Sequence, residues 1–310
     1  MMRLLFILLP ALLLTASIGA CGGSDDDGRL RVVATTTQIG ALAREVGGDR
    51  IQLAVLLQAG ADAHDFEPSA RDAVTLNQAG LVLMNGIGLD EWVERVIEGA
   101  GAAERIVVVT GGITLYESPG HDDDRASGDD HSHDDADPHV WHDPANVKVM
   151  VSNIVAALGT ADPANASLYE ANGAAYQQKL DEVDAEIRSL FAEIPEENRK
   201  LVTNHDAFGY FLRAYGLEFV GAVIPGAGSG AQPSAQQLAA LTDLIRSEGV
   251  KAIFAEAEVD PRVAQQLAND TGVRIVDGLY ADSLGAPGSG AETVDGMLLF
   301  NARKIAEALK

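Results

Sequence analysis

Histidine is the residue type with which this sequence could do its most specific chemistry, because a neutral imidazole ring binds divalent transition metals. Of the seven histidines, three stand next to segments that we expect to be β-strands: His64 in AHDFEPS, His139 in DPHVWHDP and His205 in VTNHDAFG. Asp282, in LYADSLG, follows the last expected strand. We expect each of the four at the C-terminal end of a strand, two in each half of the chain. Three imidazoles and one carboxylate are suitable ligands for zinc.

Any one of these histidines alone could equally have a hydrogen-bonded structural role. Their shared placement is what favours a metal site, because a cation held by all four side chains would join the two halves of the chain across a cleft.

A second group of histidines lies in an acidic segment, residues 117–137, which consists mostly of aspartate, histidine, serine and glycine. A segment with almost no apolar residues cannot pack into a core, so we expect it to be disordered. Its histidines, His121, His131 and His133, could still bind metal weakly and so collect it. A solvated insertion without a role is the alternative.

The N-terminus predicts export from the cytoplasm. Arg3 precedes an apolar run over residues 4–14, and small residues lead to Cys21, the only cysteine in the chain. This pattern predicts a signal peptide over residues 1–20, too short to span a bilayer. The residues before Cys21 resemble a bacterial lipobox, which implies lipidation of Cys21 and a tether over residues 21–28. An ordinary signal peptide with an incidental cysteine is the alternative.

Composition narrows the possible functions further. The net charge of −24 argues against nucleic acid as a partner, because phosphates would be repelled. A single cysteine excludes an intrachain disulfide and a thiolate metal cluster. The length is sufficient for two domains of ordinary size.

The candidate ligands need a scaffold that brings them together. Residues 29–162 and 196–310 each alternate β-branched runs with helical patterns, which predicts α/β lobes with mainly parallel sheets. Between them, apolar residues recur every three to four positions over 163–195, which predicts one long, rigid linking helix with Asp162 and Pro163 at its start. Open α/β sheets bind ligands beyond the carboxyl ends of their strands, so we expect the metal site in the interlobe cleft. The expected strands are residues 30–36, 51–57, 79–85 and 106–110, then 200–203, 219–224, 250–255 and 273–276.

These segments together resemble the metal-binding solute-binding lipoproteins of bacterial zinc and manganese ABC importers, over nearly the whole chain after the signal peptide. The resemblance implies that His64, His139, His205 and Asp282 hold the metal, and that Glu256, in IFAE, supports the site from beside the cleft. It also implies two α/β lobes joined by a rigid helix, and a flexible acidic histidine segment before the second ligand in zinc members. His142 stands where the family more often has an apolar residue. We interpret it as a surface histidine, with weak ligation as the alternative.

The function that the resemblance implies is extracytoplasmic capture of Zn²⁺ and its delivery to the membrane permease of an ABC importer. Histidine at the position of His205 favours zinc, because manganese members often have glutamate there, but Mn²⁺ and Fe²⁺ stay open. We expect a lipid-anchored monomer, which a soluble metallochaperone could load.

Two other classes of function compete with this one. A zinc hydrolase would need an open coordination position, and no His-Glu-x-x-His or nucleophile-elbow motif is present. We therefore do not expect an enzyme. An adhesin lipoprotein would bind no metal tightly.

Overall fold

The computed structural model describes residues 28–98, 103–116, 136–224 and 232–310. The predicted signal peptide, Cys21, nearly all of the tether and most of the acidic segment, with His121, His131 and His133, lie outside these residues. Within the described part of the chain, no helix is both long and apolar enough to cross a bilayer.

The first lobe is a parallel four-stranded sheet with strand order β2-β1-β3-β4. All four residues of β3 are buried, as expected for a strand covered by helices on both faces. Helix α1 starts where the Thr36 side chain accepts a hydrogen bond from the backbone N–H of Ile39. The elements are β1 (Leu30–Ala34), α1 (Thr37–Gly47), β2 (Ile51–Val55), α2 (Ala70–Gln78), β3 (Leu81–Met84), α3 (Trp92–Glu98), β4 (Ile106–Val108) and α4 (Pro144–Ala161).

Helix α4 was not predicted from the sequence. Its N-terminal signals are nevertheless ordinary ones: the Asp143 side chain caps the N–H of Ala145, and Pro144 takes the first helical position. Its buried residues at helical spacing are Val147, Met150, Val151, Ile154 and Leu158.

The second lobe repeats the same strand pattern in the order β6-β5-β7-β8, again all parallel. Ser234 and Gln237 form a reciprocal capping box at the start of α7. The elements are β5 (Lys200–Thr203), α6 (Gly209–Tyr215), β6 (Glu218–Ala222), α7 (Ala235–Glu248), β7 (Ala252–Glu256), α8 (Arg262–Thr271), β8 (Arg274–Leu279) and α9 (Val294–Leu309).

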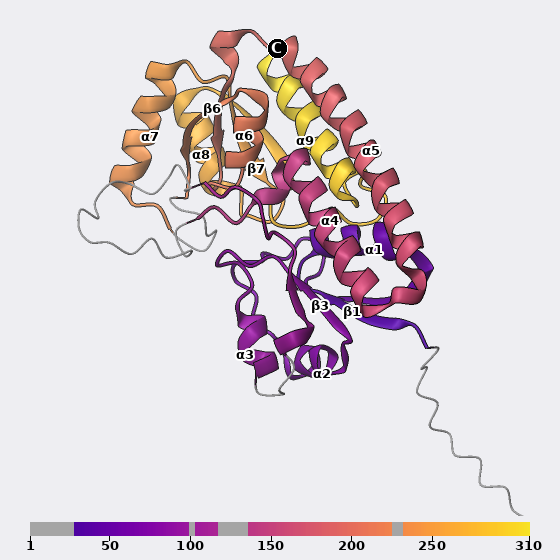
Figure 1. The fold of residues 1–310 in the computed structure, drawn as a ribbon. Helices are drawn as coiled ribbons and strands as arrows, with labels where there is room; N and C mark the ends of the chain where they lie inside the picture. Colours follow the sequence, from indigo (N-terminus) through magenta and orange to yellow (C-terminus); the bar gives the residue numbers. More distant parts are fainter. Residues whose placement is uncertain (1–27, 99–102, 117–135, 225–231) are drawn as a thin grey trace, which may run out of the picture.

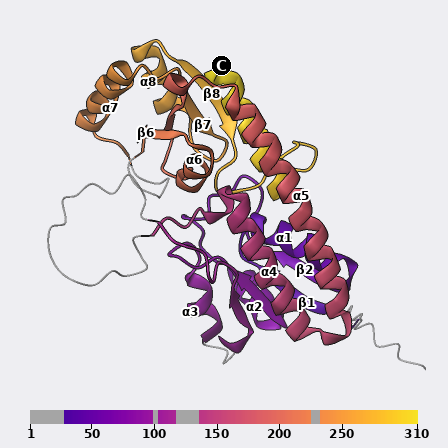
Figure 2. The ribbon, with the colours of Figure 1, turned by 45° about the horizontal axis from the view of Figure 1, so that its top comes forward.

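The predicted linking helix is present as α5 (Ala166–Ala192), 27 residues long. It begins after a 3-10 turn, Pro163–Asn165, so its first residue comes slightly later than expected. Helix α5 packs on α1 and α4 of the first lobe and on α6 and α9 of the second, and it runs along both lobes (Figures 1 and 2). The predicted fold class, two mainly parallel α/β lobes with a long linking helix, is confirmed.

The apolar core is largely shared between the lobes. One buried cluster extends from the first sheet through α4, α5 and α9 into the second lobe, with Tyr169, Leu180 and Phe191 of α5 among its members. A separate, smaller cluster lies under α7 and α8 and includes Leu241 and Ile253. Because this core is continuous between the lobes, residues on their facing edges can form one site.

Candidate metal centre

The four predicted ligands come from four separate segments. His205 lies two residues beyond β5, Asp282 lies three residues beyond β8, and His64 lies in the connection between β2 and α2. His139 differs from the expectation, because it does not directly follow a strand. It immediately precedes a 3-10 turn, Val140–His142, far along the chain from β4.

The structure brings these four side chains together between the lobes. One donor atom from each lies within 4.8 Å of every other. The Nε2 atoms of His64 and His139 are 3.1 Å apart, and His139 Nε2 is 3.1 Å from Asp282 Oδ1. His205 Nε2 lies 3.2 Å from Asp282 Oδ2, and His64 Nε2 lies 3.9 Å from Oδ1. For comparison, zinc bonds of 2.0–2.1 Å place tetrahedral ligand atoms about 3.3 Å apart.

Several polar atoms in this group have no hydrogen bond. Within the described residues, both carboxylate oxygens of Asp282 and Nε2 of His205 are buried and lack a hydrogen-bond partner. The contacts of 3.1–3.2 Å from the Asp282 oxygens to the Nε2 atoms of His139 and His205 therefore have ion-pair distances without hydrogen-bond geometry. Buried polar groups are rarely left in this state unless something else satisfies them. Donor atoms that converge on one point and include three without a hydrogen bond suit a cation at that point.

Two carboxylates hold the far sides of two of the rings. Asp137 Oδ1 accepts from His139 Nδ1 at 2.7 Å and from the His139 backbone N–H at 2.9 Å. Glu256 accepts from Nδ1 and from the backbone N–H of His205. Such carboxylate–histidine pairs fix the tautomer and leave Nε2 aimed at a metal. Glu256 was expected beside the site; Asp137 was not predicted, although its position two residues before His139 could have indicated it.

These carboxylates also change the protonation of the rings. Burial disfavours the charged form of His139, but Asp137 and Asp282 outweigh it and raise the pKa of His139 to about 9. The pKa of His205 is also raised. Burial lowers it, but the carboxylates of Glu256 and Asp282 raise it by more than burial lowers it. The pKa of His64, by contrast, is lowered to about 4, mainly by burial and then by His139. Burial raises the pKa of Asp282, but the imidazolium rings of His205 and His139 bring it well below its usual range.

Comparison with known proteins identifies the family of the chain. The family model described as zinc-uptake complex component A, periplasmic (ZnuA) matches residues 32–308. The chain belongs to this family.

Among solved structures, the periplasmic zinc binding protein TroA from Treponema pallidum shares 30% identity with a TM-score of 0.80, covering 91% of this chain and 99% of that one. The manganese-binding lipoprotein MntA of Halalkalibacterium halodurans is 30% identical over 98% of this chain and 97% of its own length. The iron-binding protein YfeA of Yersinia pestis is 33% identical over 88% and 84%. The names of these ZnuA-family relatives thus include three different metals.

Membership in the ZnuA family confirms the predicted resemblance and places the chain outside the cytoplasm, as a substrate-binding protein of the metal ABC importers. It does not distinguish between the metals.

Contacts across the lobes hold the ligand segments in place. The indole N–H of Trp141, next to the His139 ring, donates to the backbone oxygen of Ala281 at 3.0 Å, one residue before Asp282. The backbone N–H of Leu284 donates to Thr37 Oγ1 at 2.9 Å. These bonds join the segment after β8 to the first lobe, so Asp282 is positioned from both sides.

The interpretation of His142 as a surface histidine was wrong. Its side chain is fully buried, its ring lies 4.7 Å from that of Phe208, and burial lowers its pKa to about 3. Neither ring nitrogen has a hydrogen-bond partner in the described part of the chain. The imidazole ring packs here as an uncharged aromatic group, outside the set of four converging donors.

Proposed function

We propose that the chain captures Zn²⁺ outside the cytoplasm with high affinity, using His64, His139, His205 and Asp282, and delivers it to the permease of an ABC importer. The observation that carries this proposal is the convergence of three imidazole nitrogens and one carboxylate on a single point between the lobes. Zinc takes four such ligands in tetrahedral geometry.

The donor types support zinc over harder ions. Imidazole suits zinc, whereas carboxylate, carbonyl and water suit manganese. Three of the four converging side chains are imidazoles, and two of these are held by carboxylates that raise their basicity as ligands.

Manganese is the second candidate, and the names of several relatives favour it. MntA of H. halodurans is named for manganese, and PsaA of Streptococcus pneumoniae, 30% identical over 98% of this chain, is a manganese transporter lipoprotein by name. Iron, named for YfeA, is a third. These three candidates share one site and one importer class and differ only in the cargo.

Catalysis is a weaker explanation of the same site. A catalytic zinc site keeps a position open for water beside three protein ligands. Here a fourth protein donor, Asp282, lies 3.1–3.2 Å from two of the imidazoles and would close that position. An adhesin without a metal would leave the buried atoms of Asp282 without partners.

The accessory features that we propose are a lipid anchor on Cys21, a monomeric state and loading by a soluble metallochaperone. The acidic segment with His121, His131 and His133 would collect metal weakly near the site. Deleting residues 120–135 is expected to leave one tight binding event in calorimetry and to remove weak ones, since Asp137 and His139 are retained. A large loss of tight affinity would instead place one of these three histidines among the ligands.

Titration of the metal-free protein tests the cargo. We expect one tight Zn²⁺ per chain, a higher melting temperature on binding, and weaker binding of Mn²⁺ in direct competition. Because zinc binds most sites more tightly than manganese, the metal should also be measured in protein isolated from cells grown with both. Equal or tighter Mn²⁺ binding, or a native load of manganese, would overturn the zinc assignment. Absence of any tight metal would overturn the whole proposal.

A further inference from the structure

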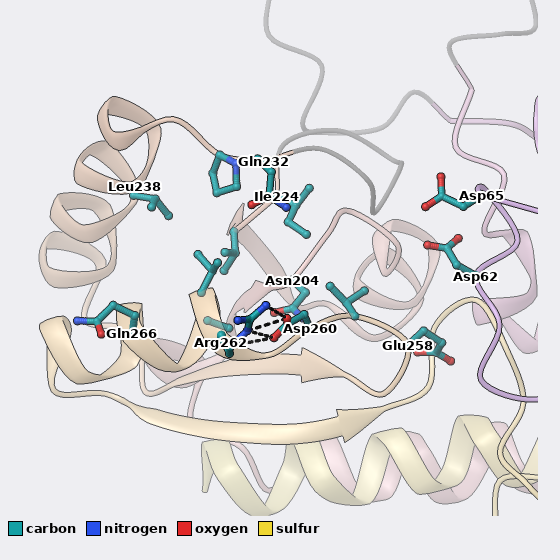
Figure 3. Close-up of a pocket in the computed structure, with 15 residues that line it drawn as sticks. Asp62, Asp65, Asn204, Ile224, Gln232, Leu238, Glu258, Asp260, Arg262 and Gln266 are labelled. Atoms are coloured by element: carbon teal, nitrogen blue, oxygen red, sulfur yellow. Dashed lines mark hydrogen bonds and ion pairs between the residues drawn. The ribbon is translucent and has the colours of Figure 1, made fainter.

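A cavity of about 630 Å³ is lined by residues of the second lobe and by Asp62 and Asp65 of the first (Figure 3). Its floor is formed at the carboxyl ends of β5, β6 and β7, and its walls include residues of α7 and α8. The sheet order β6-β5-β7-β8 makes the gap between β5 and β7 the point where the chain reverses its winding direction, which is where open α/β sheets bind ligands. Across the cavity, Asp62 and Asp65 of the first lobe direct their carboxylates toward it.

The polar wall residues are neighbours of the metal centre in sequence. Asp62 and Asp65 flank His64, Asn204 directly precedes His205, and Glu258 follows Glu256 by two residues. Among the four ligands, only His64 has an exposed side chain, 16% accessible; the other three are 0–1% accessible. An ion from solvent therefore meets His64 first, and the residues of the cavity wall that lie nearest to His64 in sequence are Asp62 and Asp65.

Two buried groups in the wall have unused hydrogen-bonding capacity. Asn204 is 1% exposed, and neither atom of its amide has a hydrogen-bond partner within the described residues. Glu258 Oε1 accepts from the backbone N–H and hydroxyl of Ser283, but Oε2 is buried without a partner in the same part of the structure. A buried amide and carboxylate in this state call for a ligand or its water.

The charge of the cavity wall determines whether it attracts a cation or an anion. Among the described residues that line the cavity, Arg262 is the only basic one, and it is paired with Asp260 at 2.6 Å. The carboxylates of Asp62 and Asp65 leave the cavity negative, so it attracts cations, whereas burial raises the pKa of Glu258 to about 7.

The oxygens of this wall are also too dispersed to bind a bare ion. Within the described residues, the ligand atoms of His64, His139, His205 and Asp282 converge, and no second such group lies in this wall. A divalent ion would therefore be held through its water shell. Six waters occupy roughly 180 Å³ at about 30 Å³ each, so a hydrated ion fits in the cavity.

We infer that this cavity is the vestibule through which a hydrated divalent cation reaches the metal centre. The carboxylates of Asp62 and Asp65 draw the ion in, Asn204 and Glu258 accept hydrogen bonds from its water, and the ion exchanges that water for His64 first. This inference rests on the proposed function, because it concerns how the same cargo arrives.

The test is the rate of Zn²⁺ association and dissociation, followed by stopped-flow fluorescence of Trp141, whose ring lies 5.4 Å from that of His139. The variant is Asp62→Asn with Asp65→Asn, in which the asparagine oxygen at position 62 can still accept the N–H of His64. The matched control is Asp243→Asn with Glu182→Gln, which removes two exposed charges away from the cavity.

We expect the association rate of the Asp62/Asp65 variant to fall about tenfold at low ionic strength and to approach the wild-type rate at high salt. The dissociation rate should fall with it, because a vestibule lies on the path in both directions, so Kd changes less than either rate. The control should stay within about twofold of wild type. An unchanged association rate, an equal effect in the control, or a faster dissociation alone would overturn the vestibule.

Asn204→Leu provides a second test that does not depend on charge. Replacing an unpartnered buried amide by an apolar group of similar size is not expected to lower the melting temperature. Slower association with an unchanged melting temperature supports the vestibule, and an unchanged rate contradicts it. The equilibrium Zn²⁺ affinity of the wild type is measured in parallel. If the wild type does not bind Zn²⁺ tightly, the proposed function fails. If it binds tightly but the variants have the wild-type association rate, only the inference of a vestibule fails.

Discussion

The imidazoles of the metal centre are of two kinds. His139 and His205 are completely buried, are each bonded to a carboxylate through Nδ1, and have raised pKa values. His64 is partly exposed, has no carboxylate on its far side within the described residues, and has a pKa lowered to about 4. The first two rings are positioned before any ion arrives. The third lies in a connection between elements and faces the solvent side, which suits a ligand that closes on the ion and opens to release it.

The largest effects should come from removing the ligands themselves. Zinc binding of about 10–16 kcal/mol, shared by four ligands, gives roughly 10²–10³-fold per ligand. We expect His139→Ala and His205→Ala to weaken zinc binding by about this factor, and His64→Ala to weaken it less, because water can take the outermost position. Competition against a chelator of known affinity measures all three. An equal loss in all three variants would remove the distinction between fixed and opening ligands.

The two kinds of ring should also differ in the protons that they release. Near neutral pH, His139 and His205 are protonated in the metal-free protein and must lose a proton to bind zinc, whereas His64 is already neutral. Two released protons would raise the zinc affinity up to about 100-fold per pH unit. Calorimetry in buffers of different ionisation enthalpy counts these protons. Release of none at pH 7 would contradict the assignment.

The same shifts predict how the metal-free protein responds to pH. The pKa of His139 in the folded state, about 9, lies above its unfolded value near 6.5. Its contribution to stability is therefore fully present below pH 6.5 and is lost as the pH rises toward 9. The melting temperature of metal-free protein should fall over this range, while the increase caused by zinc grows.

A smaller effect is expected from the carboxylates behind the rings. Asp137→Asn and Glu256→Gln keep the size of the side chain but remove its charge, and loss of such a partner typically costs 10–100-fold in metal affinity. Each substitution should also lower the pKa of its histidine and reduce proton release by about one at neutral pH. Asp181→Asn, on the exposed face of α5, is a control that should change neither quantity. Full affinity in both carboxylate variants would show that the rings are positioned by packing alone.

Much of this site could be predicted from the sequence, for physical reasons that also explain what was missed. Strands buried on both faces form continuous apolar runs, and polar residues after such runs meet at one sheet edge, which identified His205 and Asp282. Asp137 was missed because it stands among many aspartates in an acidic segment, where its position two residues before His139 was the one signal that distinguished it. The burial of His142 depends on Phe208, 66 positions along the chain, and no local pattern indicates such a contact.

Substitution of His142 should have the smallest effect on metal binding, although His142 lies only three residues from the ligand His139. It is buried and uncharged, its ring packs against Phe208, and neither nitrogen has a partner in the described residues. His142→Phe keeps an aromatic ring and removes two unsatisfied polar atoms, so we expect an unchanged or higher melting temperature. Its zinc affinity should stay within about threefold of wild type, because one lost ligand would cost far more. His142→Ala leaves a cavity and should lower the melting temperature by several degrees without a comparable loss of affinity. A loss in His142→Phe as large as that in His64→Ala would make His142 a ligand, and the site would then consist of two fixed rings and two that respond to the ion.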